Sequence, residues 1–561
     1  MKVYQAAANA VVAEGCDVAF GLVGDANMSF WSALNSTGAV RMYSARHEAG
    51  AVAMADGYAR ASGEVGLASI TSGPGLTQIG TSLTAAARNR TPLLVVVGDV
   101  AASDLNNVQK FDQRRFASAC ESEFVPITDT GNVAREMAEA FYAARLRKCP
   151  VVVNLPSDVQ EQSFDWEFSY TPTKGFLPVP EDAPRSEVVE DLVERLLVAE
   201  RPVIVAGLGA KLAGAREAIV ELADRVGALL ATSLKGKGLF TGHAFDVGLA
   251  GSFSSAPTER LLAEADFVLG IGAELGYYTT EGGLLFPDAA IARIDSAVAP
   301  PELGVLPGLY VRGDAKQTVL ALNRSLARRG IKKAGFRTAQ TIELLSAPVP
   351  ALFDTPPDGI DPRNLAREIG VALPANAVVT VGVGHFFSFF IMYSAVPHTA
   401  DVHFSYQFGS IGQTIPIAAG IGATRPGRPH LVIDGDGSAM MNIQELETMA
   451  RHGIPAVVLI WNDGGLGAEV HKMKAKGFDS SLARWPNSPD FVGVTRAFGG
   501  DGLKLTDVSG LRAALAKGFG CGGLFVIDAR VSPTVVSDPY LKLHFGKENK
   551  APLLRPAESR A

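Results

Sequence analysis

Two apolar runs joined by one helix-length segment constrain the fold of this 561-residue chain more than any other feature. The first run, HLVIDGDGS, carries Gly-Asp-Gly at residues 435–437, and the second, PAVVLIWND, ends in Asn462 and Asp463. Between them, apolar residues recur at helical spacing until a Gly-Ile-Pro sequence ends the pattern. Continuous apolar runs are typical of buried parallel strands, which need a helical crossover between them. We therefore expect Asp436 and Asp463 side by side at the carboxyl ends of adjacent strands.

Two carboxylates at such an edge indicate a divalent cation that carries a phosphate group. Mg²⁺ is usually bound by one or two carboxylates together with phosphate oxygens and water. A helix that starts near Ser438 would offer free N–H groups and the positive end of its dipole to phosphate. Gly435 and Gly437 let the backbone approach a ligand closely. An Asp-Gly pair alone is also a common turn, so the prediction depends on both strand ends together.

Length and composition exclude several classes of protein. A chain of 561 residues is too long for one core and indicates three or four domains. A hydrophobic fraction of 47% with 19% charged residues is typical of a large, well-buried soluble protein. The net charge of -7 provides no basic surface for nucleic acid. The chain contains no apolar run long enough to predict a membrane span.

The cysteines and the first residues bear on the cellular compartment. Cys16, Cys120, Cys149 and Cys521 lie far apart without metal-binding spacing, so we expect reduced, mostly buried thiols. Residues 1–15 carry polar side chains in a helical pattern, which favours a first helix over a signal peptide. Both observations favour a cytoplasmic protein.

Apolar runs alternate with helical stretches along the whole chain, which predicts an α/β fold built on parallel sheets covered on both faces. The glycine-rich run PVIVAGLGAKLAG matches the dinucleotide-binding pattern poorly, which favours a structural middle domain over a nucleotide-binding one. Proline-rich stretches separate the domains as linkers. The expected units are domains at 1–165, 186–325 and 361–531, linkers at about 163–185 and 326–360, and a tail at 532–561 that either folds over the site or stays loose.

Four motifs occur in order along the chain: RHEAGAVAMADGYAR around Glu48, SGPG at 72–75, GSIG at 409–412, and the Gly-Asp-Gly to Asn-Asp stretch. With them the sequence resembles the thiamine-diphosphate (ThDP) enzymes of the acetolactate synthase, pyruvate decarboxylase and benzaldehyde lyase superfamily. The resemblance implies three doubly wound domains, which are a pyrimidine-binding, a central and a diphosphate-binding domain. It also implies ThDP and Mg²⁺ as cofactors.

The resemblance assigns the metal ligands. It implies that the side chains of Asp436 and Asp463 and the carbonyl of Gly465 bind Mg²⁺, with Gly435, Gly437 and Ser438 beside the diphosphate. The family usually has two asparagines where this chain has Asn462 and Asp463. The extra negative charge should strengthen the metal requirement.

The resemblance also makes Glu48 the acid that activates the cofactor. Taken alone, a glutamate in a first helical turn is ordinary compensation of the helix dipole. In the family, a carboxyl group forms a hydrogen bond to the aminopyrimidine ring of ThDP and makes its imino tautomer accessible. This tautomer removes the proton from C2 of the thiazolium ring, which gives the ylide.

Three further residues are predicted near the reacting carbons. By resemblance, Asp25 in GLVGDANMSF reaches the substrate as in pyruvate-decarboxylase-type enzymes, although an aspartate there also suits a helix N-cap. Gln109 stands where decarboxylases carry two histidines, and it matches a glutamine of acetolactate-synthase-like and benzaldehyde-lyase-like enzymes. Glu469 lies where decarboxylases keep a glutamate that assists carboxylate loss and protonation, and its alternative is an exposed helical glutamate.

Other positions are implied to hold the cofactor. Ile411 would lie between the two rings of ThDP, and the Gly409 carbonyl would accept a hydrogen bond from the aminopyrimidine. Pro74 would belong to the loop that lies against the pyrimidine ring. Gly384 and His385 could approach the diphosphate, with a partly buried loop histidine as the alternative. An isoleucine in a core or a Gly-Pro-Gly turn would look the same without these motifs.

The expected function is a ThDP- and Mg²⁺-dependent lyase or decarboxylase. It would act on a 2-oxo acid or 2-hydroxyacyl compound through a ylide and an enamine, with carboligation as a further activity. One alternative is an acetolactate-synthase-like carboligase, and another is a ThDP-binding regulatory subunit without turnover. The resemblance implies a homodimer or a dimer of dimers, because Glu48 of one chain meets the diphosphate held by another. No nucleic-acid or membrane partner is expected.

Overall fold

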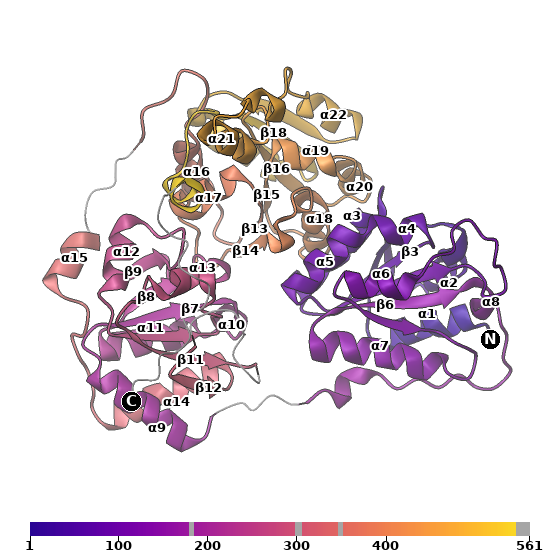
Figure 1. The fold of residues 1–561 in the computed structure, drawn as a ribbon, viewed down its shortest axis with the longest axis horizontal. Helices are drawn as coiled ribbons and strands as arrows, with labels where there is room; N and C mark the ends of the chain where they lie inside the picture. Colours follow the sequence, from indigo (N-terminus) through magenta and orange to yellow (C-terminus); the bar gives the residue numbers. More distant parts are fainter. Residues whose placement is uncertain (179–183, 298–305, 346–351, 546–561) are drawn as a thin grey trace.

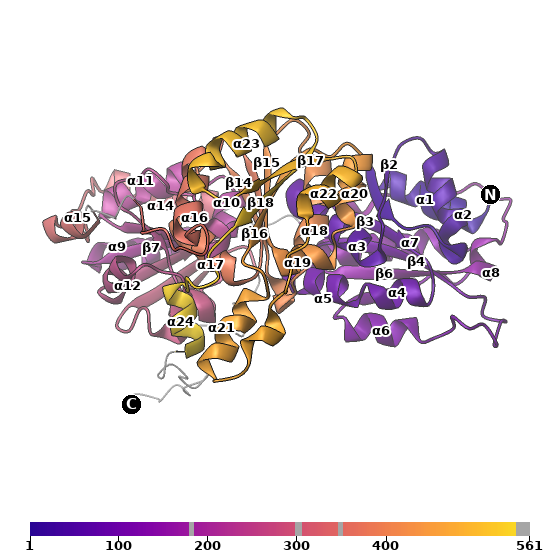
Figure 2. The same cartoon turned by 90° about the horizontal axis from the view of Figure 1, so that it is seen from above.

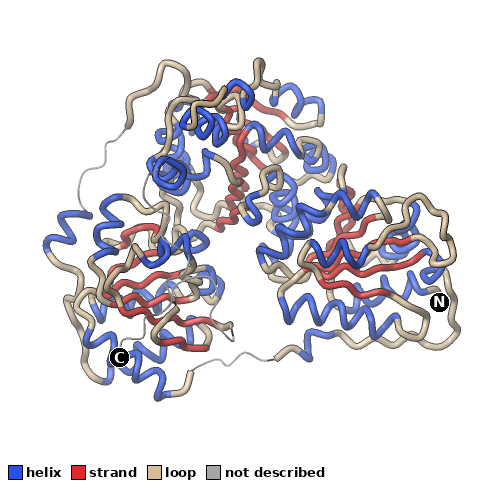
Figure 3. Tube along the Cα trace, viewed as in Figure 1, coloured by secondary structure: helices blue, strands red, loops and turns tan. Residues whose placement is uncertain are grey.

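The chain folds into three lobes, each built on a six-stranded sheet with helices on both faces (Figures 1 and 3). This computed structural model describes residues 1–178, 184–297, 306–345 and 352–545. All strand pairs within the three sheets are parallel. The predicted α/β class with three doubly wound domains is therefore confirmed.

The N-terminal lobe has the strand order β2-β1-β3-β4-β6-β5. Its strands are β1 (Val18–Gly21), β2 (Arg41–Ser44), β3 (Gly66–Ile70), β4 (Leu93–Asp99), β5 (Glu123–Pro126) and β6 (Pro150–Pro156). Its helices are α1 (Val3–Ala13), η1 (Asp25–Asn27), α2 (Met28–Ser36), α3 (Glu48–Ser62), α4 (Pro74–Gln78), α5 (Gly80–Asn89), α6 (Gln113–Ala119), α7 (Val133–Arg147), α8 (Ser157–Gln160) and η2 (Thr173–Phe176). The segment after α8 is fastened to this lobe, because Tyr170 and Thr173 both bond the buried carboxylate of Glu14.

The middle lobe has a different strand order, β12-β11-β10-β7-β8-β9. Its strands are β7 (Pro202–Ala206), β8 (Leu229–Thr232), β9 (Asp246–Leu249), β10 (Phe267–Ile271), β11 (Ala290–Asp295) and β12 (Leu309–Arg312). Its helices are α9 (Ser186–Val198), α10 (Leu208–Leu212), α11 (Arg216–Val226), η3 (Leu234–Gly236), α12 (Ala256–Ala263), α13 (Tyr277–Thr280), η4 (Glu281–Gly283), α14 (Ala315–Arg328) and α15 (Ala339–Leu345). In the glycine-rich run after β7, the N–H of Gly209 donates to the carbonyl of Gly272 at 2.9 Å, so this loop packs on neighbouring backbone.

The C-terminal lobe repeats the order of the N-terminal lobe, as β14-β13-β15-β16-β18-β17. Its strands are β13 (Val378–Gly382), β14 (Asp401–Ser405), β15 (His430–Gly435), β16 (Ala456–Asn462), β17 (Asp501–Leu505) and β18 (Leu524–Arg530). Its helices are α16 (Pro362–Ala372), α17 (His385–Tyr393), η5 (Gln407–Gly409), α18 (Thr414–Thr424), α19 (Asp436–Met441), α20 (Glu445–Arg451), α21 (Gly467–Ala475), η6 (Ser480–Ala483), α22 (Phe491–Ala497), η7 (Val508–Gly510), α23 (Leu511–Gly520) and α24 (Asp538–Phe545). Strands β15 and β16 are adjacent, and Gly435 pairs with Trp461, so the two polar strand ends emerge together.

The crossover between β15 and β16 is not the single helix that apolar spacing predicts. Helix α19 ends at Met441, and α20 begins only at Glu445. Asn442 leaves helical geometry at φ -137°, and its amide donates to the Gly412 carbonyl at 2.6 Å. Met440, which lies just before the break, is exposed.

Helices α3 and α18 join the N-terminal and C-terminal lobes of the chain (Figures 1 and 2). Their backbones approach closely, because a Cβ at Gly57 would lie 2.1 Å from the Ile417 carbonyl oxygen. A Cβ at Gly420 would lie 1.8 Å from the Met54 carbonyl oxygen. Only glycine fits at these two crossings.

The end of the described chain folds back onto the C-terminal lobe. Helix α24 packs against α17 and α21 (Figure 2). The remainder of the predicted tail, 546–561, lies outside the described residues. Among the described helices, none has the length and apolar character needed to cross a membrane. All four cysteines are free thiols, and Cys521 is exposed rather than buried.

Candidate active site

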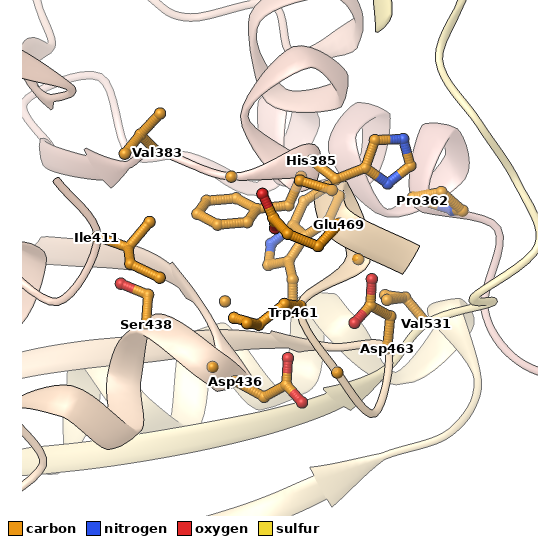
Figure 4. A pocket seen from close by; sticks show the side chains of 18 of the residues that line it. Pro362, Val383, His385, Ile411, Asp436, Ser438, Trp461, Asp463, Glu469 and Val531 are labelled. Atoms are coloured by element: carbon orange, nitrogen blue, oxygen red, sulfur yellow. The ribbon is translucent and has the colours of Figure 1, made fainter. Parts of the chain in front are cut away.

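A cavity of about 360 Å³ lies at the carboxyl edge of the C-terminal sheet (Figure 4). We call it the sheet-edge cavity. Eleven predicted site residues line it, namely Gly384, His385, Gly409, Ile411, Gly435, Asp436, Gly437, Ser438, Asp463, Gly465 and Glu469. The fold thus gathers residues from four separate sequence segments around one space.

Asp436, which is buried, and Asp463, which is half-buried, bring two carboxyl groups to this cavity. Burial raises the pKa of Asp436 to about 6. Burial, and next the charge of Asp436, raise the pKa of Asp463 to about 7. Two carboxylates that repel each other in a buried place fit a divalent cation, which would remove the repulsion.

The rest of the donor set also fits Mg²⁺. Among residues 1–178, 184–297, 306–345 and 352–545, no group of three or more His, Cys, Asp or Glu side chains could hold a metal. Mg²⁺ does not need such a group, because phosphate oxygens and water complete its shell. Asn462 braces the strand end instead, since its amide donates to Asp528 and Ser488 at 2.8 Å each.

The GSIG loop is tied to the start of α19. The hydroxyl of Ser438 accepts the N–H of Gly412 at 2.8 Å, and Asn442 bonds the Gly412 carbonyl. These contacts hold Ile411 at the cavity wall beside Ser438 (Figure 4). The GSIG loop, which we expect to shape the cofactor, is therefore fixed to the start of α19, which we expect to bind the phosphates of the cofactor.

His385 begins helix α17, and its imidazole points away from the cavity centre (Figure 4). Its ring lies 4.5 Å from the ring of His471 and 4.9 Å from that of Tyr540, measured between centroids. Burial, and then the proximity of His471, lower the pKa of His385 to about 3. The imidazole is therefore neutral near pH 7 and packs as part of the wall, while Gly384 exposes backbone to the cavity.

Glu469 lies on the cavity wall in the first turn of α21. Its side chain is 50% exposed, and its Oε1 lies 3.5 Å from Nζ of Lys472, which also lines the cavity. The carboxylate is thus accessible to a bound molecule.

The other four predicted residues lie on the N-terminal lobe, and none of them lines the sheet-edge cavity of the described chain. Glu48 is buried at the start of α3 and accepts a hydrogen bond from Gln78 at 3.2 Å. The side-chain oxygen of Gln109 accepts a hydrogen bond at 2.5 Å from the hydroxyl of Ser72, and Ser72 belongs to the turn that also contains Pro74. Asp25 is exposed at the start of η1. We call these four residues the N-terminal group.

Family models match all three lobes. Residues 1–119 match the thiamine pyrophosphate enzyme N-terminal TPP binding domain. Residues 189–322 match the central domain, and residues 382–529 match the C-terminal TPP binding domain. The chain belongs to the thiamine pyrophosphate enzymes.

Curated relatives of this thiamine pyrophosphate enzyme extend over nearly the whole chain. A probable 2-ketoarginine decarboxylase of Pseudomonas aeruginosa is 30% identical over 542 residues, which are 92% of this chain and 91% of that protein. A probable acetolactate synthase large subunit of Methanocaldococcus jannaschii is 29% identical, with 95% and 92% covered. The acetolactate synthase isozyme 2 large subunit of Escherichia coli is 29% identical, with 93% and 94% covered. The protein is accordingly a ThDP enzyme of the decarboxylase or carboligase type.

Sequence motifs missed several residues that line the cavity of this thiamine pyrophosphate enzyme. Phe386 and Phe389 follow His385 in the run HFFSFF, whose helical spacing could have indicated one shared face. Tyr540 reaches the cavity only because α24 folds back, where its hydroxyl donates to the Ala468 carbonyl at 3.0 Å. No sequence motif near Tyr540 predicts that contact. The other lining residues that were missed are Pro362, Val383, Trp461, Leu466, Gly467, Ala468, Val531 and Ser532.

Proposed function

We propose that the protein is a ThDP- and Mg²⁺-dependent decarboxylase or carbon–carbon lyase that acts on a 2-oxo acid or a 2-hydroxyacyl compound. The observation that carries this choice is the accessible carboxylate of Glu469 in the sheet-edge cavity. A positioned carboxyl group can supply the proton with which an aldehyde product leaves. The similarity to a probable 2-ketoarginine decarboxylase supports the same choice.

The residues of the cavity suit both cofactors. Asp436, Asp463 and the carbonyl of Gly465 would hold Mg²⁺, and the metal would hold the diphosphate. Gly435 and Gly437 would expose backbone to the phosphates. When bound, ThDP supplies the nucleophilic carbon that adds to the carbonyl group of the substrate.

A second copy of the chain would complete the site. The N-terminal group does not line the cavity of its own chain, although Glu48 is the acid that the resemblance assigns to the cofactor. We therefore propose a homodimer or a dimer of dimers in which Glu48 of one protomer faces the sheet-edge cavity of its partner. In that position Glu48 would hold a proton at the pyrimidine ring, and Asp25 and Gln109 would contact the substrate.

A product analysis tests the reaction type. The protein with ThDP and Mg²⁺ is incubated with a panel of 2-oxo acids and 2-hydroxyacyl-CoA thioesters, and products are identified by mass spectrometry. We expect aldehyde release to exceed formation of ligated products.

Glu469→Gln should lower kcat more than it changes KM, by about 10²-fold, because it removes a proton donor and leaves the binding wall intact. Steady-state kinetics on the best substrate of the panel measures this. Glu217→Gln on α11 of the middle lobe serves as the control, because the Glu217 side chain is 78% exposed.

The second candidate is an acetolactate-synthase-like carboligase. The resemblance of Gln109 to the glutamine of acetolactate-synthase-like enzymes favours it, and so do the acetolactate synthase relatives. Conversion of pyruvate mainly to acetolactate, with Glu469→Gln unimpaired, would replace the decarboxylase proposal with this one.

A further inference from the structure

Trp485 contacts the aspartate of the Gly-Asp-Gly sequence from a segment 49 residues further along the chain. Its indole Nε1 donates to Oδ2 of Asp436 at 2.6 Å. The indole ring also covers the adjacent backbone, because a Cβ at Gly437 would lie 3.3 Å from Cζ2 of Trp485. An indole N–H can only donate, so its bond to Asp436 favours the charged carboxylate and fixes the orientation of that group.

The same segment also holds the second metal-site loop. The backbone N–H of Trp485 donates to the carbonyl of Gly464 at 2.9 Å, and Leu466 donates to the carbonyl of Ala483 at 2.8 Å. Gly465 and Arg484 form an antiparallel bridge between these two bonds. Residues 483–485 therefore run along the loop that follows Asp463 and are bonded to it on both sides of the bridge.

We propose that Trp485 is a positioning residue for the divalent metal. Its side chain fixes Asp436 at the end of β15, and its backbone fixes the loop that carries Asp463 and Gly465 at the end of β16. The two halves of the metal site are thus held together by one residue that supplies no ligand. This inference rests on the proposed Mg²⁺ site, and it follows the general rule that partners of metal ligands set their orientation.

Trp485→Phe tests the proposal, because it keeps an aromatic ring over Gly437 and removes the N–H. The dissociation constant for Mg²⁺, measured by calorimetry at saturating ThDP, should rise at least about 10-fold. Trp166→Phe is the matched control, since Trp166 is 52% exposed and stacks on Phe164 of the N-terminal lobe. The control should bind Mg²⁺ like the wild type.

Two further readouts separate positioning of the metal from a general loss of structure. Mg²⁺ should change the tryptophan fluorescence of the wild type and of Trp166→Phe, and this change should be smaller in Trp485→Phe, where Trp461 is the tryptophan left at the cavity. Trp485→His restores a ring N–H and should recover part of the affinity. The melting temperature of the metal-free protein should differ little between wild type and Trp485→Phe.

Equal Mg²⁺ affinity and an equal fluorescence response in wild type and Trp485→Phe would overturn the role of Trp485. A wild type that binds no Mg²⁺ in the presence of ThDP would overturn the proposed metal site as well. The wild-type titration therefore distinguishes the two failures.

Discussion

At the scale of single residues, burial changes the pKa values of the acidic groups at the candidate site. Asp436 is buried and Asp463 is half-buried, and the pKa of each carboxyl group is raised by its surroundings, so the cation site that we propose there would gain stability when a cation binds. Glu48 is buried too, but its carboxylate has a hydrogen-bond partner, Gln78, and belongs to a different lobe.

Glu48→Gln should retain ThDP binding and lose exchange of the cofactor C2 proton by about 10²- to 10⁴-fold. The amide keeps the shape of the side chain but cannot share a proton with the pyrimidine ring. Exchange is measured by quenched-flow proton NMR, and binding is measured by calorimetry. Glu64→Gln, two residues beyond the end of α3, is the control and should behave as the wild type. Near wild-type exchange in Glu48→Gln would refute its role.

His430 should make the protein lose stability as the solution is acidified. Burial lowers the pKa of His430 to about 3, against an unfolded value near 6.5. Between these two values the unfolded state binds the extra proton, so the free energy of unfolding falls as pH falls, by at most about 1.4 kcal/mol per pH unit. Above about pH 6.5 the residue contributes no pH dependence.

The test compares wild type with His430→Gln by thermal unfolding between pH 7 and pH 4. The variant should show a shallower fall in melting temperature, because glutamine does not titrate. Glutamine can still bond Thr380, whose hydroxyl lies 2.9 Å from Nε2 of His430. Parallel pH profiles for both proteins would show that His430 is not the cause.

At the scale of secondary-structure elements, the contact between α3 and α18 determines how the lobes meet. The helices cross with glycine against backbone on both sides, at Gly57 and Gly420. Ser82 adds a polar link, because its hydroxyl donates to Gln413 just before α18. Since α3 begins with Glu48 and α18 follows the GSIG loop, this packing also connects two segments of the proposed catalytic machinery.

Gly420→Ala should destabilise the protein by about 1–3 kcal/mol, because the new methyl group would clash with the Met54 backbone, which cannot move aside. Thermal unfolding followed by circular dichroism measures the effect. Gly520→Ala is the matched control, since it also lies in a helix of the C-terminal lobe and its Cβ would meet no atom within 4 Å. Equal losses in the two variants would contradict the close crossing.

At the scale of the whole molecule, the separation of the N-terminal group from the sheet-edge cavity has a direct consequence for activity. If the active sites lie between protomers, each site combines Glu48 from one chain with Asp436 from another. Two variants that damage different halves can then complement each other.

Glu48→Gln and Asp436→Ala should each be inactive alone and should recover activity when refolded or co-expressed together. Random pairing gives half hybrid dimers, each with one intact site, so activity should reach about a quarter of the wild-type level. Affinity tags on each variant allow the hybrid to be isolated and assayed. A hybrid with no activity would indicate that each site is built within one chain.

The sequence by itself determined the α/β class, the three sheets and the polar ends of β15 and β16. Each of these depends on local signals, because apolar runs and helical spacing reflect which faces are buried. The family motifs added residues at loops that follow strands, and eleven of these residues line one cavity. The fold class and these site residues can therefore be predicted from short sequence segments.

Only the tertiary structure decided contacts between distant segments. Asn442 ends α19 by bonding Gly412, Trp485 reaches Asp436, and Tyr540 closes the cavity wall from α24. None of these pairings has a periodic signal, because each depends on how whole elements pack and on where a buried donor or acceptor finds its partner.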